Sequence, residues 1–147
     1  MVTRAALTLP FALAPDEMDR WLAPARAGTL AVFLDYDGTL TPIVGRPEQA
    51  TLTEPMRTVL AELAPRCPVT IVSGRDVAVV RAFVRLDALG YVGNHGLDIV
   101  GPPGSGLRRE LASSFVPTID DAEDRLRRSL RGIDGVIVER KRFSISG

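Results

Sequence analysis

Two aspartates, Asp35 and Asp37, stand two positions apart directly after a short apolar run. Because successive side chains of an extended strand point to opposite faces, both carboxylates are predicted to point the same way and to share one pocket. Two carboxylates beside a phosphate monoester repel each other and the substrate, so such a pocket needs a divalent cation, and hard oxygen ligands suit Mg²⁺. One carboxylate could then attack phosphorus while the other protonates the leaving oxygen and activates water.

The same pair can also be interpreted as two solvated residues of a turn, because aspartate and glycine are common in turns. A calcium-binding loop is excluded. Gly38 comes two places earlier than the glycine that such a loop requires. Arg46 occupies the twelfth position, where the loop needs a bidentate glutamate. The turn and the phosphoryl-transfer site remain as alternatives.

A second polar segment, from Ser73 to Asp76, follows another apolar run. The spacing of Ser73 and Asp76 is that of a capping box at the start of a helix. This is compatible with binding an anion, since a helix N-terminus is itself an anion site. Arg75 is then either a ligand of phosphate or sugar, or an exposed arginine on the helix face.

Hydrophobic patterns indicate the elements that would position these residues. Apolar runs predict buried strands at residues 30–34, 69–72, 91–92 and 97–100. Helical patterns, the second with Thr53 as N-cap, predict helices at residues 15–28, 53–65 and 76–86. The predicted apolar helix faces consist of Met18, Trp21 and Leu22, of Met56, Val59, Leu60 and Leu63, and of Val79, Val80, Phe83 and Leu86.

Strands that alternate with helices across short connections predict an α/β fold with a parallel, doubly wound sheet. Ligands of such sheets bind at the carboxyl ends of the strands. One mouth would therefore be surrounded by Asp35, Asp37, Ser73, Arg75 and His95.

Glycine and proline dominate residues 101–106, which indicates a linker. We therefore expect an N-terminal helical segment at residues 1–28, a core at 29–106 and the start of an α/β cap at 107–147. In the cap we expect a charged helix at residues 120–131 and short strands at 136–138 and 143–145. The helix would expose to solvent the arginines at positions 125, 127, 128 and 131.

Composition limits the classes of function. The chain has 147 residues, 46% of them apolar, enough for one domain with a core. Eighteen basic and eighteen acidic residues give no net charge, which argues against nucleic acid or an anionic membrane as partner. A single cysteine, Cys67, excludes an internal disulfide and favours a reducing, cytoplasmic location. The apolar stretch between Arg4 and Ala14 loosely imitates a secretory signal, but Pro10 interrupts it and we predict none.

The nine residues 35–43 (DYDGTLTPI) after an apolar strand resemble motif I of the haloacid dehalogenase superfamily, in the form that trehalose-6-phosphate phosphatases carry. The resemblance implies that Asp35 is the nucleophile, that Asp37 is the acid and base, and that both positions hold Mg²⁺, the second through its main-chain carbonyl. Gly38 would let backbone N–H groups approach the phosphate, and Thr39 would brace the loop. Ser73 and Gly74 are similar to motif II, which binds the transferring phosphoryl group through the hydroxyl and the following amide.

Two weaker matches concern the sugar. Asn94 and His95 lie in a Gly-Asn-His-Gly segment similar to one near the bound disaccharide phosphate, although a lone histidine in a turn is more often a packing residue. One histidine and one cysteine cannot form a Zn²⁺ site. Glu139 and Lys141 match a Glu-x-Lys element that the family uses to bind trehalose, and they also fit an ordinary exposed strand face.

The resemblance implies a Mg²⁺-dependent phosphatase that hydrolyses trehalose 6-phosphate through an aspartyl-phosphate. A phosphatase of another sugar phosphate and a non-catalytic sugar-phosphate-binding module are the alternatives. The family's motif III lysine and its acidic motif IV are not found in these residues, so we expect a truncated or split enzyme that a complementing polypeptide could complete. The strand at residues 30–34 would then lie at a sheet edge.

Overall fold

The computed structural model describes residues 14–28 and 30–146 and divides into two units, residues 1–30 and 31–147. The first unit contains helix α1 (Pro15–Arg26), which confirms the first predicted helix. Proline suits its first position and Arg26 suits the carboxyl-terminal turn, where Arg26 pairs with Asp19 at 2.9 Å. The stretch in which we predicted no secretory signal lies, up to residue 13, outside the described residues.

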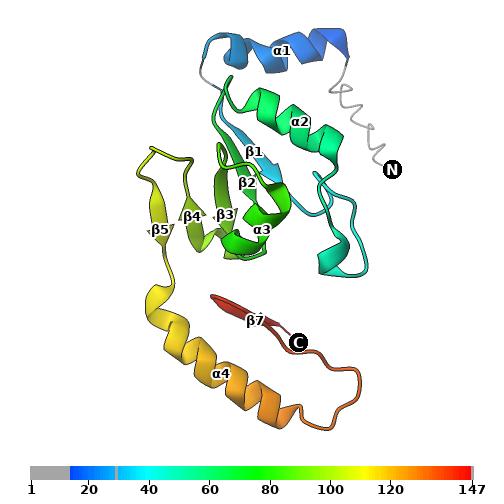
Figure 1. The fold of residues 1–147 in the computed structure, drawn as a ribbon, viewed down its shortest axis with the longest axis vertical. Helices are drawn as coiled ribbons and strands as arrows, with labels where there is room; N and C mark the ends of the chain where they lie inside the picture. The colour runs from blue at the N-terminus through cyan, green and yellow to red at the C-terminus, as the bar shows by residue number, and fades with distance from the viewer. Residues whose placement is uncertain (1–13, 29, 147) are drawn as a thin grey trace, which may run out of the picture. The chain divides into compact units, whose positions relative to one another are not determined.

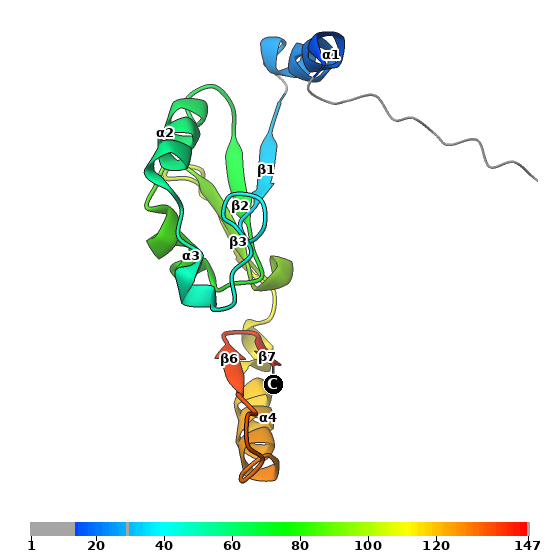
Figure 2. The same cartoon turned by 90° about the vertical axis from the view of Figure 1, so that its right-hand side faces the viewer.

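The second unit is built on a five-stranded sheet with the order β1-β2-β3-β4-β5 (Figure 1). Strands β1 (Val32–Asp35), β2 (Val69–Val72) and β3 (Gly90–Gly93) are parallel, and helices α2 (Glu54–Leu63) and α3 (Val77–Val84) connect them. Both helices lie on the same face of the sheet (Figure 2). The register pairs Asp35 with Val72, so the polar residues that follow β1 and β2 lie together at the carboxyl end of these strands.

Helices α2 and α3 lie where the sequence predicted them, and they differ from the prediction in how they begin and end. Thr53 caps α2, where its hydroxyl accepts a hydrogen bond from the Met56 N–H at 3.4 Å. The predicted capping box is absent, because α3 begins after Asp76 and the Ser73 hydroxyl accepts from the Arg75 N–H instead. Helix α3 ends at Val84 and turns Val77, Val80 and Val84 into the core. Val79, one of the apolar residues that indicated this helix, is exposed.

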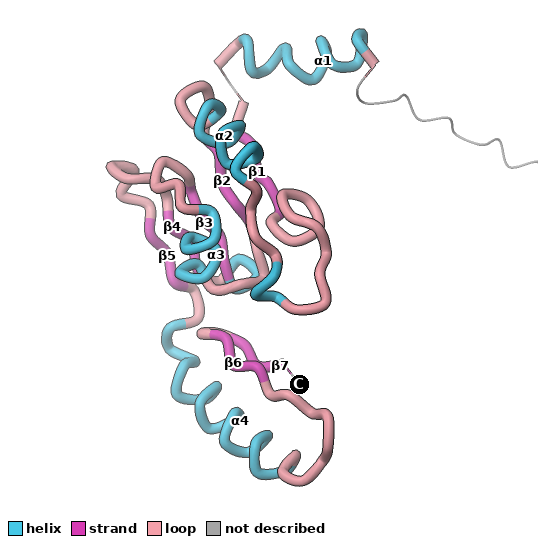
Figure 3. Tube along the Cα trace, turned by 45° about the vertical axis from the view of Figure 1, so that its right-hand side comes forward, coloured by secondary structure: helices cyan, strands magenta, loops and turns pink. Residues whose placement is uncertain are grey.

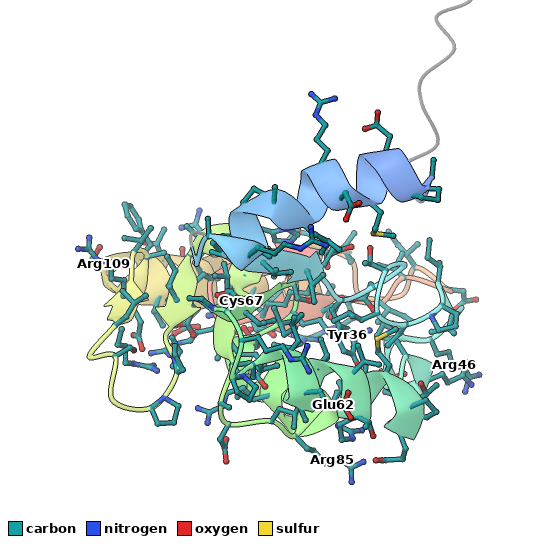
Figure 4. The ribbon with its side chains drawn as sticks, turned by 90° about the horizontal axis from the view of Figure 1, so that it is seen from above. Tyr36, Arg46, Glu62, Cys67, Arg85 and Arg109 are labelled. Carbon is teal, nitrogen blue, oxygen red and sulfur yellow. The ribbon has the colours of Figure 1, made fainter. Side chains whose placement is uncertain are left out.

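The core lies between the sheet and the two helices. Its fully buried side chains include Tyr36, Leu60, Ile71, Val80 and Tyr91. Tyr36 lies in the interior of the unit, whereas Arg85 at the end of α3 lies at its rim (Figure 4). Burial of each such apolar side chain contributes about 1.5–3 kcal/mol, so this layer holds the strand ends in fixed positions.

The sheet is mixed, whereas we predicted it to be parallel. Strand β4 (Asp98–Val100) is antiparallel to β3, and β5 (Arg108–Glu110) is antiparallel to β4. Only four residues separate β3 from β4, too few for a parallel crossover, which needs a dozen or more. Residues 101–106 are therefore a connection inside the sheet and not a linker. The domain boundaries that we placed at 28/29 and 106/107 stay a prediction.

After β5 the chain forms a helix beside a hairpin (Figure 3). These elements are α4 (Val116–Ser129), β6 (Glu139–Lys141) and β7 (Ser144–Ser146), with β6 and β7 antiparallel. The predicted strand at residues 136–138 is wrong, since pairing begins at Glu139. The four arginines are exposed as predicted, and two of them pair with acids one turn earlier, Arg125 with Asp121 and Arg127 with Glu123.

Short 3₁₀ turns lie in the connections between these elements, at Pro47–Gln49 (η1), Asn94–Gly96 (η2) and Ser113–Phe115 (η3). Across residues 14–28 and 30–146, no helix is long and apolar enough to cross a membrane.

Candidate functional site

Asp35 and Asp37 flank a side chain that is fully buried. Tyr36 points into the core with no exposed area, while both aspartates are exposed. This alternation is what an extended backbone produces, and it agrees with the prediction that the two carboxylates leave the strand on the same side. Within the described residues, the Asp35 side chain makes no hydrogen bond or ion pair.

The turn after Asp37 is closed around the Tyr36 carbonyl. This oxygen accepts hydrogen bonds from the N–H groups of Leu40 and Thr41, both at 3.1 Å, and from the Thr41 hydroxyl at 3.2 Å. Gly38 has a φ of +88°, a conformation that favours glycine, and its N–H donates to the Thr41 carbonyl. The threonine that braces the loop is therefore the buried Thr41 and not the exposed Thr39 that we predicted.

Arg75 binds Asp37 through two hydrogen bonds. Its Nε lies 2.9 Å from Oδ2 of Asp37, and its Nη2 lies 2.6 Å from Oδ1. The guanidinium also lies over the rings of Tyr36 and Phe83, at 5.6 and 5.4 Å from their centres. The hydrogen bond to Asp37 raises the pKa of Arg75. With only 13% of its side chain exposed, Arg75 is not the solvated helix-face arginine of the alternative interpretation.

The segments that resemble motif II and the Asn-His turn are in contact. A Cβ added to Gly74 would lie 2.6 Å from Cε1 of His95, so the imidazole packs directly against this glycine. The Asn94 N–H donates to the Arg75 carbonyl at 2.8 Å. The structure therefore brings the ends of β2 and β3 together, as predicted.

Asn94 and His95 differ in exposure. Asn94 is 1% exposed and its side-chain amide donates to Asp76, which leaves no surface for a substrate. The contacts of Asn94 are those of a residue that holds the loop, and its binding to substrate stays a prediction. His95 is exposed beside Gly74.

A pocket of about 450 Å³ is lined by residues that follow the carboxyl ends of β1 and β2 and by residues of β6. Five predicted site residues line it, namely Asp37, Gly74, Arg75, Glu139 and Lys141. Six of the predicted residues lie outside its lining, namely Asp35, Gly38, Thr39, Ser73, Asn94 and His95.

The other residues that line the pocket were not predicted from the sequence. They are Ile43, Val44, Pro47 and Glu48 from the β1–α2 connection, Asp76 and Arg140, and Val79 and Phe83 from α3. A signal for the first four was available, because a connection that leaves the carboxyl end of a strand borders the ligand site in this class of sheet.

The turn between β6 and β7 is tied to the sheet by Arg142. Its backbone N–H donates to Oδ1 of Asp76 at 3.1 Å, and its guanidinium donates to both carboxylate oxygens of Glu110 at 3.1 and 2.8 Å. These bonds hold β6 where Glu139 and Lys141 face the pocket. Arg140, between them, lines the pocket as well, so the placement of Glu139 and Lys141 on one side of the strand stays a prediction.

The residues fit a Mg²⁺ ion in part. Among the described residues no three histidine, cysteine or acidic side chains come together in a metal-binding cluster. Mg²⁺ usually keeps several waters and takes one or two protein carboxylates together with substrate phosphate, so a smaller donor set is sufficient. The Asp35 carboxylate is available for this role, whereas both side-chain oxygens of Asp37 are bound to Arg75.

Comparison with known proteins identifies the family. The sequence model that describes trehalose-phosphatases matches residues 33–146. The chain belongs to the trehalose-phosphatase family. The resemblance of residues 35–43 to motif I in its trehalose-6-phosphate phosphatase form agrees with this assignment.

Two relatives and one solved structure illustrate the similarity to known proteins. Over 143 residues the chain is 42% identical to an uncharacterised glycosyl hydrolase of Mycobacterium tuberculosis, with 97% of this chain and 11% of the relative covered. Over 116 residues it is 43% identical to the trehalose-phosphate phosphatase of Mycobacterium ulcerans, with 79% and 30% covered. The solved C-terminal domain of Candida albicans trehalose-6-phosphate phosphatase gives a TM-score of 0.65 at 31% identity, with 82% and 43% covered. The chain spans less than half the length of each of them.

Proposed function

We propose that this trehalose-phosphatase chain carries the nucleophile-bearing part of an enzyme that hydrolyses trehalose 6-phosphate to trehalose and phosphate. The observation that carries the proposal is a single pocket that joins Asp37 and Arg75, at the carboxyl end of the sheet, to Glu139 and Lys141 on β6. The first pair suits a reacting phosphate, and the second pair offers an acceptor and a donor to sugar hydroxyls.

The reaction proceeds in two displacements at phosphorus. A carboxylate oxygen of Asp35 forms a bond to phosphorus while the bond from phosphorus to the sugar oxygen breaks, which gives an aspartyl-phosphate. Asp37 donates a proton to the leaving oxygen, and trehalose departs. Asp37 then takes a proton from a water whose oxygen attacks phosphorus, so phosphate leaves and the Asp35 carboxylate is restored.

The contacts of the two aspartates support this division of roles. A nucleophile needs an accessible carboxylate, and the exposed Asp35 side chain makes no hydrogen bond or ion pair among the described residues. An acid and base needs a fixed position, and Arg75 holds Asp37 by two charge-assisted hydrogen bonds.

The Asp35 carboxylate and the Asp37 main-chain carbonyl would hold Mg²⁺. This donor set leaves the hydrogen bonds between the Asp37 side chain and Arg75 undisturbed. Bound there, the ion would neutralise the charge that phosphate brings close to two carboxylates.

Phosphate release tests the proposal. It is measured with Mg²⁺ and a panel of sugar phosphates, on this chain alone and on this chain joined to the C-terminal remainder of the M. ulcerans relative. We expect release from trehalose 6-phosphate and its loss by several orders of magnitude in Asp35→Asn, because phosphoryl transfer then lacks its nucleophile. The exposed Asp87, which pairs with Arg81 on α3, provides a matched control in Asp87→Asn. Full turnover by Asp35→Asn contradicts the mechanism, and release from other sugar phosphates alone contradicts the substrate.

A non-catalytic binding module is the second candidate. The observation in its favour is that the described residues do not assemble a complete metal cluster. Calorimetry on this chain with Mg²⁺ and trehalose 6-phosphate separates the two functions. Tight binding without phosphate release, by the chain and by the fusion, would favour the module.

A further inference from the structure

The connection between β1 and α2 is anchored at both ends by one residue. The carbonyl of Tyr36 accepts the hydrogen bonds of Thr41, and the hydroxyl of Tyr36 donates to the Ala50 carbonyl at 2.7 Å. Thr41 and Ala50 are both buried, at 3% and 1% exposed. The eight residues between them, residues 42–49, therefore form a loop with fixed ends and not a loose excursion.

The interior of this loop is ordered by its own backbone. The Gln49 N–H donates to the Arg46 carbonyl at 3.0 Å, and the Ala50 N–H donates to the Pro47 carbonyl at 3.3 Å, which forms the turn η1. Glu48 occupies the middle of this turn. Arg46 projects outward at the edge of the unit (Figure 4), while Glu48 lines the pocket.

The loop folds back over the turn that carries Asp37. A Cβ added to Gly38 would lie 3.2 Å from Cγ1 of Ile43, so this side chain covers the residue next to the acid and base. Ile43 is 87% exposed although it is fully apolar, and together with Val44 it gives the pocket an apolar wall beside Glu48. A large exposed apolar side chain at the rim of a pocket is the feature expected of a ligand contact.

The chemistry of this wall suits a sugar ring better than a phosphate. A carboxylate accepts hydrogen bonds from hydroxyl groups and repels phosphate oxygens, while apolar side chains pack against the C–H face of a ring. Arg75, at the floor of the same pocket, is the group that attracts phosphate. Glu48 is close enough that its charge contributes to the raised pKa of Arg75. The acceptor and the cation therefore line one pocket, whose volume of about 450 Å³ can hold a sugar phosphate.

We propose that Glu48 is a specificity-determining residue of this pocket, where its carboxylate accepts hydrogen bonds from the hydroxyls of the sugar whose ring packs on Ile43. The inference rests on the proposed function, because it names the wall that recognises the sugar of the same substrate. It places one wall of the sugar site on the β1–α2 loop, in the pocket that Glu139 and Lys141 of β6 also line.

Calorimetry on the whole chain tests the inference with two probes, trehalose 6-phosphate and inorganic phosphate, in the presence of Mg²⁺. Glu48→Ala is expected to weaken binding of trehalose 6-phosphate by about tenfold or more, as the loss of hydrogen bonds to a charged group does. Inorganic phosphate should bind the variant and the unaltered chain within about twofold of each other. Glu48→Gln keeps the shape and one acceptor, so an intermediate loss is expected.

Two controls make the outcome decisive. Glu62→Gln changes an exposed glutamate of α2 that lines a different hollow, and it should leave both affinities unchanged. Equal unfolding midpoints of Glu48→Gln and the unaltered chain establish that the fold is retained. Unaltered binding of trehalose 6-phosphate by Glu48→Ala, or an equal loss for both probes, overturns the inference while the proposed function stands. Absence of binding of trehalose 6-phosphate to the unaltered chain contradicts the proposed function, and the inference falls with it.

Discussion

Arg75 donates hydrogen bonds to both carboxylate oxygens of Asp37, a residue 38 positions earlier in the chain. The pair connects the end of β1 to the segment between β2 and α3. In the proposed mechanism, a phosphate oxygen takes over one of these hydrogen bonds, which frees one Asp37 oxygen for proton transfer while the other stays bound to Arg75.

Arg75→Ala should reduce phosphate release in the fusion enzyme by about 10²-fold, the usual loss when one group that stabilises transition-state charge is removed. Arg75→Lys should recover only part of this activity, since an ammonium cannot bind two oxygens in the planar geometry of a guanidinium. The measurement is kcat and KM for trehalose 6-phosphate. Arg81→Lys is the matched control, because Arg81 lies on α3 and pairs with the exposed Asp87. If Arg75→Ala retains full kcat, Arg75 has no part in the reaction.

Two glycines at the carboxyl ends of β2 and β3 should respond differently to a methyl group. A Cβ at Gly93 would meet the Arg75 carbonyl and the Val77 nitrogen, each at 2.7 Å, and these backbone atoms cannot move without distorting the start of α3. A Cβ at Gly74 would meet the ring of His95, a side chain that can rotate away. We expect Gly93→Ala to destabilise the fold by about 1–3 kcal/mol, the range for overpacking, and Gly74→Ala to destabilise it less.

Removal of the His95 imidazole should affect the stability of the two glycine variants differently. The double variant Gly74→Ala with His95→Ala should regain most of the lost stability, whereas His95→Ala should not rescue Gly93→Ala. Denaturant unfolding of the four variants measures these differences. If His95→Ala fails to restore stability to Gly74→Ala, the contact between Gly74 and His95 is not the source of the loss.

The sequence allowed prediction of what local patterns determine. Each parallel strand was found because a run of apolar residues is visible without knowledge of its neighbours, and the exposure of Asp35 and Asp37 followed from the pleat. The predicted burial of the first strand was wrong, because Phe33 of β1 is 67% exposed. The antiparallel direction of β4 could have been inferred from the short connection after β3. The strand predicted at residues 136–138 failed because an apolar run favours a strand only where a partner strand pairs with it.

Contacts between distant segments were beyond prediction from one sequence. The pairing of Arg75 with Asp37 depends on the β1–β2 register and on the rings of Tyr36 and Phe83, which hold the guanidinium in place. Glu48 lacked any motif, and only its position in the folded loop brings it to the pocket. The missing information is tertiary geometry, which neither spacing nor propensity contains.

Stability should fall in alkaline solution because of a buried tyrosine. Burial raises the pKa of Tyr91 from its usual 10.0 to about 12, and its hydroxyl donates to the Leu86 carbonyl at 2.6 Å. Between these two pH values the unfolded chain loses the proton while the folded chain keeps it. The stabilisation is therefore complete below about pH 10 and is lost as pH rises towards 12, by an amount on the order of 2 kcal/mol.

Tyr91→Phe tests this dependence. The variant should lose some stability at neutral pH with the hydrogen bond, and its free energy of unfolding should decline less steeply between about pH 10 and pH 12 than that of the unaltered chain. Burial also raises the pKa of Tyr36, so a residual alkaline decline is expected in the variant. Denaturant unfolding at a series of pH values gives the slopes, and identical slopes would exclude Tyr91 as their source.

The free side of β1 should promote association between copies of this chain. Within the described residues β1 is the first strand of the sheet and pairs only with β2, and its Phe33 is 67% exposed. An edge with unpaired backbone groups and an apolar side chain invites pairing with another chain, and a lysine at such an edge opposes it. We expect Phe33→Lys to increase the monomer fraction in sedimentation velocity at high protein concentration. Val59→Lys, at an exposed apolar residue of α2, should change it much less. An equal gain from both variants would mean that added charge, and not the edge of β1, controls the association.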